Sequence, residues 1–393
     1  MESAKRTGDE GGTGGSMIED SATHSPAVPA STDSGGHRET VGSAAGTVDV
    51  RVHESMDVST AEAIRLFLRS KPGPWLSHDP AWLAILSRGL RQRPYYLQAR
   101  RNGQTVGVLP LAYVSSFLFG RYLVSLPYLN YGGPIADDEV AANALVDHAA
   151  RLADQLNVRY LELRNQLEIK HPALTEKKTS KVLMWRELPS STDELWKSFK
   201  PEVRNQIRKG EKCELRVAWG THDLLSDFYA VFSQNMRDLG TPVFGRALFA
   251  SILAELAGRS ELCLVYLGAQ PIAGALLLHG EGFTEVPSAS SLREHNKTCA
   301  NMLMYHHLLL RALERGQRFF DFGRSSEDSG TYKFKRQWKA EPHPSVWQYY
   351  VREGSISEVR PDNPKYQRKI ETWKKLPLWL TRLVGPAIVR GIP

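Results

Sequence analysis

Residues 262–278 read LCLVYLGAQPIAGALLL, two apolar runs on either side of the turn residues Gly268 to Pro271. Short apolar runs that flank a turn containing Gly and Pro are typical of two antiparallel strands. A membrane-spanning helix would need a run of about 20 apolar residues, and the turn residues interrupt this one. The segment therefore predicts a β-hairpin in a folded core.

The same pattern occurs earlier in the chain. QTVGVLPL at residues 104–111 resembles QPIAGALL at residues 270–277, and VRYLELR at residues 158–164 resembles QRFFDFG at residues 317–323. The spacing between the two members is similar in each half. We therefore expect two copies of one α/β unit, each with helices, a hairpin, a third strand, a helix and a further strand. A chance similarity between two generic α/β halves is the alternative.

The composition is that of a folded protein with two domains. The chain has 393 residues, of which 41% are hydrophobic and 24% are charged, and these values exclude a wholly disordered or fibrous protein. Three cysteines, far apart, exclude a disulfide framework and a Cys-rich zinc site. No apolar run follows the N-terminal MESAKR, so no secretory signal is expected and the predicted location is cytoplasmic.

The net charge of +7 suits an anionic ligand, an anionic membrane surface or a nucleic acid, and it selects none of these. A slightly basic surface without a specific partner is the alternative.

Local composition divides the chain further. Residues 1–48 are rich in Gly, Ser, Thr and Ala, and the first aromatic residue is Phe67, so a disordered tail is predicted. The two α/β units are expected at residues 49–190 and 191–352. Residues 353–393 combine Lys and Arg with Trp and Leu, which is typical of a basic amphipathic segment at a membrane surface. We expect peripheral contact with the inner face of the membrane, with packing against the two domains as the alternative.

Four motifs carry a resemblance to a known family: FKPEVRNQIRKGEK (199–212), NMRDLGTP (235–242), DFGRS (321–325) and GTYKFKRQW (330–338). Together they resemble the motifs of FemAB-like proteins associated with exosortase and exopolysaccharide systems, over about residues 48 to 391. The resemblance implies an α/β (α+β) fold with two tandem GNAT-like domains, the acyl-CoA N-acyltransferase fold, and a BioF2-like acetyltransferase domain.

The resemblance also implies an acyltransferase. The enzyme would join an acyl or aminoacyl group to an amine of a cell-envelope or exopolysaccharide-related precursor, either a small molecule or a lipid-linked saccharide or peptide. The donor would be an acyl-CoA or an aminoacyl-tRNA used as a co-substrate, so contact with tRNA is one expectation. No tightly bound cofactor, no metal and no DNA are expected. The alternative is a catalytically silent GNAT-fold protein that binds or assembles components of polysaccharide export.

The candidate catalytic residues lie in the last two motifs. The resemblance assigns to Lys335 the stabilisation of negative charge during acyl transfer, a role that a fixed cation can perform on an oxyanion; a surface lysine is the alternative. Asp321 and Arg324 lie at the C-terminal end of a predicted strand, where open α/β sheets bind ligands. Arg324 is expected to contact an anion or, alternatively, to pair with Asp321. Tyr332 is expected to contact substrate.

Further substrate contacts are expected outside these motifs. Arg204 and Arg208 share one face of the helix predicted at residues 199–212. We expect them to bind a phosphate-bearing substrate, with a solvated basic face as the alternative. NYGGPIAD at residues 130–137 resembles the acceptor segment of Fem proteins, which implies that Asn130 and Asp137 contact the acceptor. Alternatively, its glycines form a turn and Asp137 caps the next helix.

LREHNKTCA at residues 292–300 stands where acetyl-CoA enzymes of this fold carry a Gly-rich loop that binds pyrophosphate through backbone amides. This segment contains no glycine. Its composition therefore disfavours acetyl-CoA binding of the usual kind and supports the silent alternative.

Overall fold

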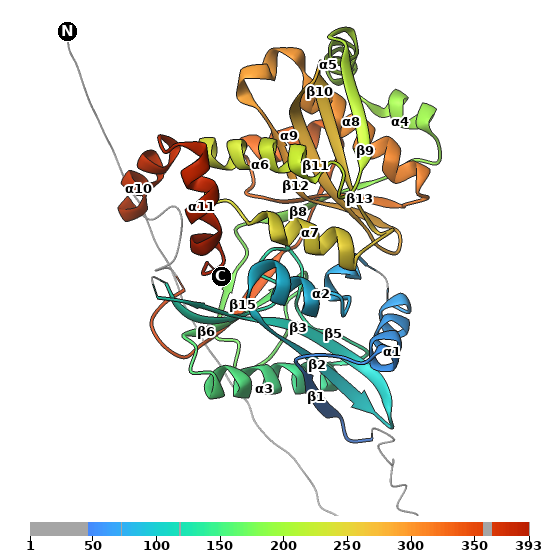
Figure 1. Cartoon of the computed structure of the whole chain (residues 1–393). Coiled ribbons are helices and arrows are strands. Elements are labelled where there is room, and N and C mark those ends of the chain that lie inside the picture. Colours follow the sequence, from blue (N-terminus) through green and yellow to red (C-terminus); the bar gives the residue numbers. More distant parts are fainter. Residues whose placement is uncertain (1–45, 72, 118, 357–363, 393) are drawn as a thin grey trace, which may run out of the picture. The chain divides into compact units, whose positions relative to one another are not determined.

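The computed structural model describes residues 46–71, 73–117, 119–356 and 364–392. The predicted disordered tail, residues 1–48, thus lies outside the described residues except for residues 46–48. The described part contains two mixed β-sheets covered by helices (Figure 1).

The first sheet has eight strands, seven of them in one continuous path. Along that path the order is β1 (Asp49–His53), β2 (Arg93–Arg101), β3 (Gln104–Ser116), β4 (Gly120–Val124), β6 (Tyr160–Asn165), β15 (Val346–Val351) and β7 (Glu176–Lys178). The short β5 (Ile135–Ala136) pairs with β3. Only β4 and β6 are parallel neighbours, and the other pairs are antiparallel.

The second sheet has seven strands. Their order is β9 (Leu215–Gly220), β10 (Ser260–Leu267), β11 (Gln270–His279), β12 (Phe283–Ser291), β13 (Phe319–Ser325), β8 (Val182–Glu187) and β14 (Glu341–His343). Again the fourth and fifth strands are parallel and the other neighbours are antiparallel. The two sheets therefore share one order and one set of directions, which confirms the predicted repeat.

One strand of each sheet comes from the other half of the chain. β8 precedes the expected domain boundary after residue 190 but lies in the second sheet beside β13. β15 lies within the range expected for the second domain, yet it returns to the first sheet between β6 and β7. In Figure 1, β15 has the orange of a late segment beside the green of β6. A cut after residue 190 therefore does not separate the two sheets.

Helices cover both faces of each sheet. On the first sheet, α3 (Glu139–Gln155) packs on the face that contains Leu97, and α1 (Val58–Arg69) packs on the face that contains Tyr96. On the second sheet, α5 (Pro201–Lys212) and α8 (Ala300–Glu314) cover one face, while α6 (Leu225–Leu239) and α7 (Arg246–Glu255) cover the other. This alternation of apolar side chains is what a strand buried on both faces requires.

The remaining helices are shorter or terminal. They are η1 (Trp75–His78), α2 (Trp82–Ala84), η2 (Ile85–Gly89), α4 (Thr192–Ser198), η3 (Arg293–Thr298), α9 (Gly330–Gln337), α10 (Pro364–Lys374) and α11 (Leu378–Val389). Among the described residues, no helix is both long and apolar enough to cross a membrane.

The parallel strands of each sheet pair over only three residues. β12 pairs with β13 from Phe283 to Glu285, opposite Phe319 to Asp321, and no pairing continues toward their C-terminal ends. Gly323 interrupts β13 just after this point with a left-handed φ of 74°, and the register with β8 shifts between Asp321 and Arg324. β12 and β13 therefore separate near Asp321.

Candidate functional site

Two buried carboxyl groups lie side by side where β12 and β13 separate. Glu285 and Asp321 are register partners in the last parallel pair, with exposed fractions of 5% and 1%. Register partners on adjacent strands direct their side chains to the same face of the sheet. The structure thus places two acids at the opening between the strands.

A loop from the first half closes over Asp321. The Tyr131 hydroxyl donates to Asp321 Oδ2 at 2.6 Å and accepts from Trp185 Nε1 at 2.6 Å. The Gly323 amide donates to the other oxygen, Oδ1, at 2.7 Å. Trp185 lies on β8, the strand that the first half contributes to the second sheet. Asp321 is therefore held by groups from both halves.

Lys335 approaches the same point from α9. Ser329 caps this helix by accepting from the Tyr332 amide. Lys335, three residues after Tyr332 on the same helix, is buried. Its Nζ donates to the carbonyl oxygens of Gly323 at 3.0 Å and Arg324 at 2.8 Å. Burial lowers the pKa of Lys335 to about 8, against the opposing attraction of Asp321. Lys335 is therefore not the surface lysine of the alternative interpretation.

The carboxyl pair holds protons more tightly than exposed acids do. Burial and the neighbouring Asp321 charge raise the pKa of Glu285 well above its ordinary value. Burial also raises the pKa of Asp321, although Tyr131, Gly323 and Lys335 act in the opposite direction. Two close acids in one buried site cannot both ionise without cost. The pair is therefore suited to accept or donate a proton.

Arg324 lies beside this cluster with unused donors. Its Nε donates to Asn130 Oδ1 at 3.0 Å, and its guanidinium lies 3.5 Å from the ring centre of Trp347 on β15. Among the described residues no carboxylate lies within ion-pair distance, so the alternative pair with Asp321 is not formed. Burial and the nearby Arg164 charge lower the pKa of Arg324. In the same described part of the chain, the buried Ser325 Oγ and Trp347 Nε1 have no hydrogen-bond partner.

Arg164 on β6 fixes the loop that carries Asn130 and Tyr131. Its Nη1 donates to the carbonyl oxygens of three loop residues, Leu126, Pro127 and Leu129, at 3.1, 2.8 and 2.7 Å. Its Nε donates to buried Glu162 at 2.9 Å. A buried arginine with a carboxylate partner and three carbonyl acceptors is a rigid support. The loop is thereby positioned from the first sheet.

A small cavity lies at the opposite end of β12. Its volume is about 260 Å³, and it is lined by Gln206 of α5 and by residues between Ser291 and Met302. The segment 292–300 forms η3 here, and Cys299 begins α8 in a left-handed conformation with no side-chain cap. The cavity therefore opens beside the first turn of α8.

The structure brings together only some of the predicted residues. Asn130, Asp321, Arg324 and Lys335 meet at the cluster just described. Tyr332 is on the helix of Lys335 and packs, partly buried, against the core of the second half.

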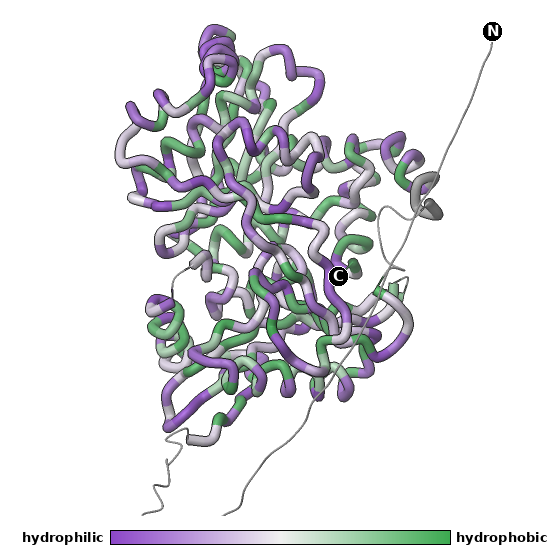
Figure 2. Tube along the Cα trace, turned by 180° about the vertical axis from the view of Figure 1, so that it is seen from behind, coloured by the Kyte–Doolittle hydropathy of each residue, from purple (hydrophilic) through white to green (hydrophobic). Residues whose placement is uncertain are grey.

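The other predicted contacts lie elsewhere. Arg204 is half-buried and Arg208 is exposed on α5, the hydrophilic helix at the top of Figure 2; Arg208 lies 5.4 Å from the ring centre of Trp196. The α5 residue that lines the cavity beside α8 is Gln206, and neither arginine lines it. Asp137 is exposed and pairs with Lys71. The alternative interpretation of Asp137 as a helix cap is wrong, because Asp138 caps α3 by accepting from the Ala141 amide at 2.9 Å.

Sequence analysis missed three members of the cluster: Tyr131, Trp185 and Glu285. Tyr131 is inside the motif NYGGPIAD, but a tyrosine next to two glycines is equally typical of an ordinary turn. Glu285 left a detectable signal, since an acidic residue within an otherwise uncharged strand is rarely buried without a role.

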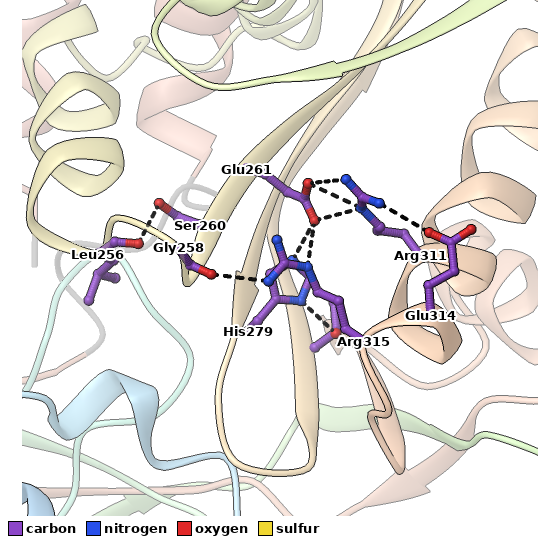
Figure 3. Close-up of polar contacts among 9 residues, drawn as sticks. Leu256, Gly258, Ser260, Glu261, His279, Arg311, Glu314 and Arg315 are labelled. Atoms are coloured by element: carbon purple, nitrogen blue, oxygen red, sulfur yellow. Dashed lines mark hydrogen bonds and ion pairs between the residues drawn. The ribbon is translucent and has the colours of Figure 1, made fainter.

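A second buried polar cluster lies where β10 begins and β11 ends (Figure 3). Glu261 accepts from His279 Nε2 at 2.9 Å, from Arg311 and from Arg315. Burial opposes ionisation, but the His279 and Arg311 hydrogen bonds lower the pKa of Glu261 to about 2. Arg315 also lines a cavity of about 500 Å³ that includes Arg65 of α1. Within the described residues, no group of three His, Cys, Asp or Glu side chains could hold a metal ion.

Comparison with known families gives one match, in the second half of the chain. Residues 197–336 match the family described as the acetyltransferase (GNAT) domain. The matched segment is about a third of the chain and is similar to GNAT-type acetyltransferase domains. It extends from α4 to α9 and contains Glu285, Asp321, Arg324 and Lys335.

Solved structures extend the similarity to both halves. FemX has a TM-score of 0.58 with 17% identity, over 80% of this chain and 99% of FemX. A tandem GNAT protein from the clavulanic acid biosynthesis pathway has a TM-score of 0.52 with 13% identity, over 79% of this chain and 100% of that protein. L-PGS from Bacillus licheniformis has a TM-score of 0.51 with 15% identity, over 84% of this chain and 98% of L-PGS. The protein thus shares its fold with FemX and with the tandem GNAT protein. A comparison with curated proteins gave no match.

Proposed function

We propose that this GNAT-type acyltransferase transfers an acyl or aminoacyl group to an amine of a cell-envelope or exopolysaccharide-related precursor. The observation that carries the proposal is the buried cluster of Glu285, Asp321 and Lys335 where β12 and β13 separate. FemX and L-PGS, which share the fold, favour an aminoacyl or acyl transfer at the cell envelope.

The chemistry of amide formation matches this cluster. An amine nitrogen attacks the carbonyl carbon of a thioester or ester, so a C–N bond forms and the C–S or C–O bond breaks. The attacking nitrogen loses a proton, and the raised pKa of the Glu285 and Asp321 pair makes these carboxylates suitable acceptors. Negative charge develops on the carbonyl oxygen, and the Lys335 ammonium has a third N–H that its two carbonyl partners do not use.

Donors around Arg324 favour an anionic acceptor. The guanidinium has no carboxylate partner among the described residues; its Nε donates to Asn130 and its plane lies over the Trp347 ring. Its remaining N–H donors match a phosphate or carboxylate. We therefore place the anionic part of the precursor at Arg324.

The donor is an acyl-CoA or an aminoacyl-tRNA. AcCoA is named with the tandem GNAT protein of the clavulanic acid pathway, which favours a CoA thioester. The segment 292–300, which has no glycine, favours the aminoacyl-tRNA. In either case, the cavity between Gln206 and Met302 is the proposed place for the donor's carrier group.

A catalytically silent binding or assembly protein remains the second candidate. Its support is that Tyr131 already donates to Asp321, and Lys335 already donates to the carbonyl oxygens of β13, within a buried network. Such a network would hold the two halves together without any chemistry.

Mass spectrometry of the reaction product distinguishes the two. CoA thioesters and aminoacyl-tRNAs are first screened for a rise in melting temperature, and the donor that binds is then offered with amine-bearing precursors. We expect Lys335→Met to lower turnover by about 10²–10³-fold, and Lys333→Met, an exposed lysine on the same helix, to leave it unchanged. Wild-type turnover in the Lys335 variant would overturn the catalytic role. A donor that binds without any product would support the silent protein.

A further inference from the structure

Helix α11 exposes two of its largest apolar side chains. Thr381, Gly385 and Val389 form its buried face, one turn apart. Trp379 and Leu383 are 66% and 70% exposed. A surface helix normally buries its larger apolar side chains and exposes the polar ones, so α11 has the opposite orientation.

The contacts of α11 explain how this orientation is held. A Cβ added at Gly385 would lie 2.9 Å from the Val243 amide nitrogen, so only glycine allows this close approach to the segment after α6. Arg382 donates to Ser233 Oγ of α6 at 2.8 Å. Thr381, Arg382 and Gly385 therefore help to dock α11, and Trp379 and Leu383 are left outward.

A second apolar group lies close to the end of this helix. Gly391 is in contact with Ser116, since an added Cβ would come within 2.5 Å of the Ser116 Cβ. The next residue, Phe117, is fully exposed in the turn after β3. The Gln92 amide donates to the Arg390 carbonyl at 2.8 Å and holds the end of α11 at the first sheet. The exposed Phe117 therefore follows a residue that contacts the C-terminal end of α11.

Positive charge accompanies this apolar surface. Residues 364–393 contain seven Lys and Arg residues and one acidic residue, Glu371. Exposed Lys375 lies three residues before the start of α11, and exposed Arg390 directly follows its last residue. The two cations therefore lie at the two ends of the helix. Tryptophan with flanking cations is the composition of a helix that lies in a membrane interface.

We propose that α11 and the Phe117 turn form one surface that binds an anionic phospholipid membrane. The helix lies along the interface, with Trp379, Leu383 and Phe117 among the acyl chains and with Lys375 and Arg390 at the phosphates. A second copy of the chain is a poorer occupant, because a symmetric contact would bring the same cations face to face. The surface would hold the enzyme near a lipid-linked acceptor, but binding to lipid does not depend on the proposed reaction.

Co-sedimentation of the full chain with phosphatidylglycerol vesicles tests this proposal, with phosphatidylcholine vesicles as the comparison. We expect binding to phosphatidylglycerol, and we expect Trp379→Ser with Leu383→Ser to weaken it about tenfold or more. Lys375→Gln should weaken it about fivefold and reduce its sensitivity to salt. The matched control is Leu66→Ser, which changes an equally exposed leucine on α1.

Binding by the double serine variant at the wild-type level would overturn the proposal. So would a wild-type chain that does not sediment with phosphatidylglycerol but forms a dimer that the double variant loses. Melting temperatures of all variants, measured in parallel, show whether each is folded; Phe117→Ser alone tests the turn if the double variant fails to fold.

Discussion

The Tyr131 hydroxyl lies 2.6 Å from Asp321 Oδ2 and 2.6 Å from Trp185 Nε1, and it donates to the first and accepts from the second. One phenol thereby links a loop of the first half to two adjacent strands of the second sheet. Burial and the Asp321 charge raise the pKa of Tyr131 well above its ordinary value, so the hydroxyl stays protonated and can donate.

Tyr131→Phe is expected to lower the free energy of unfolding by about 1–3 kcal/mol, because it leaves a buried carboxyl and a buried indole N–H with one partner fewer. Urea denaturation measures this change. Tyr95→Phe is the control, since Tyr95 is also buried and its hydroxyl makes no hydrogen bond within the described residues. Equal effects of the two substitutions would contradict the proposed link.

Arg324→Gln is expected to raise the KM for the acceptor about tenfold or more, with a smaller change in kcat, because the guanidinium is proposed to bind an anionic group that does not react. Steady-state kinetics with the identified acceptor measures both constants. Arg318→Gln, on an exposed arginine next to β13, should change neither. A loss confined to kcat would instead place Arg324 at the reacting atoms.

Glu285→Gln is expected to stabilise the protein more at high pH than at low pH. The folded state raises the pKa of Glu285 above the ordinary 4.5, so it binds this proton more tightly than the unfolded chain does. The cost of ionising the buried group therefore grows as the pH rises above 4.5. The variant removes that cost, and its gain in melting temperature should increase with pH. A gain that is the same at every pH would show that Glu285 is not the group responsible.

Glu261 should make the protein less stable as the pH falls, whereas Glu285 makes it less stable as the pH rises. Its pKa falls from 4.5 to about 2 on folding, so its stabilising effect is complete above pH 4.5 and is lost as the pH falls toward 2. One pKa unit corresponds to about 1.4 kcal/mol, which gives a loss of about 3 kcal/mol across this interval. Urea denaturation at a series of pH values measures the loss in the wild type. Glu261→Gln should be less stable at neutral pH and should lack this part of the acid sensitivity.

The exchanged strands predict how fragments of the chain behave. A fragment of residues 46–190 would lack β15 and would carry β8 without its sheet, so we expect little folded structure by circular dichroism. The complementary fragment, residues 191–393, should behave in the same way. Co-expression of both should restore a folded complex, because the two strands can then pair. A fragment of residues 46–190 that melts cooperatively by itself would contradict this prediction.

The order of the strands was predictable because local patterns determine most of it. Hairpins such as β10 and β11 follow from apolar runs around a short turn, and the two repeats predict the same order twice. The exchange of β8 and β15 was not predictable. Each is a six-residue strand whose neighbours, β13 and β6, are determined by long-range packing that no local pattern shows.

The candidate site, like the fold, was predictable only where its residues lie in continuous sequence motifs. Lys335 and Arg324 were found through motifs that are continuous in sequence. Glu285 and Asp321 come together only through the register of a three-residue parallel ladder, and Tyr131 reaches them only because Arg164 holds its loop. Arg204 and Arg208 share a helix face as predicted, yet the direction of that face depends on how α5 packs on α8.

The exchange of β8 and β15 also limits how a substrate can enter. If one half rotated as a rigid body, it would have to withdraw a strand from the other half's sheet and break its ladder of hydrogen bonds. The chain crosses between the sheets twice, and each crossing strand brings an indole to the site, Trp185 on β8 and Trp347 on β15. A movement of one sheet relative to the other would therefore have to bend both crossings at once and displace the two indoles at the site.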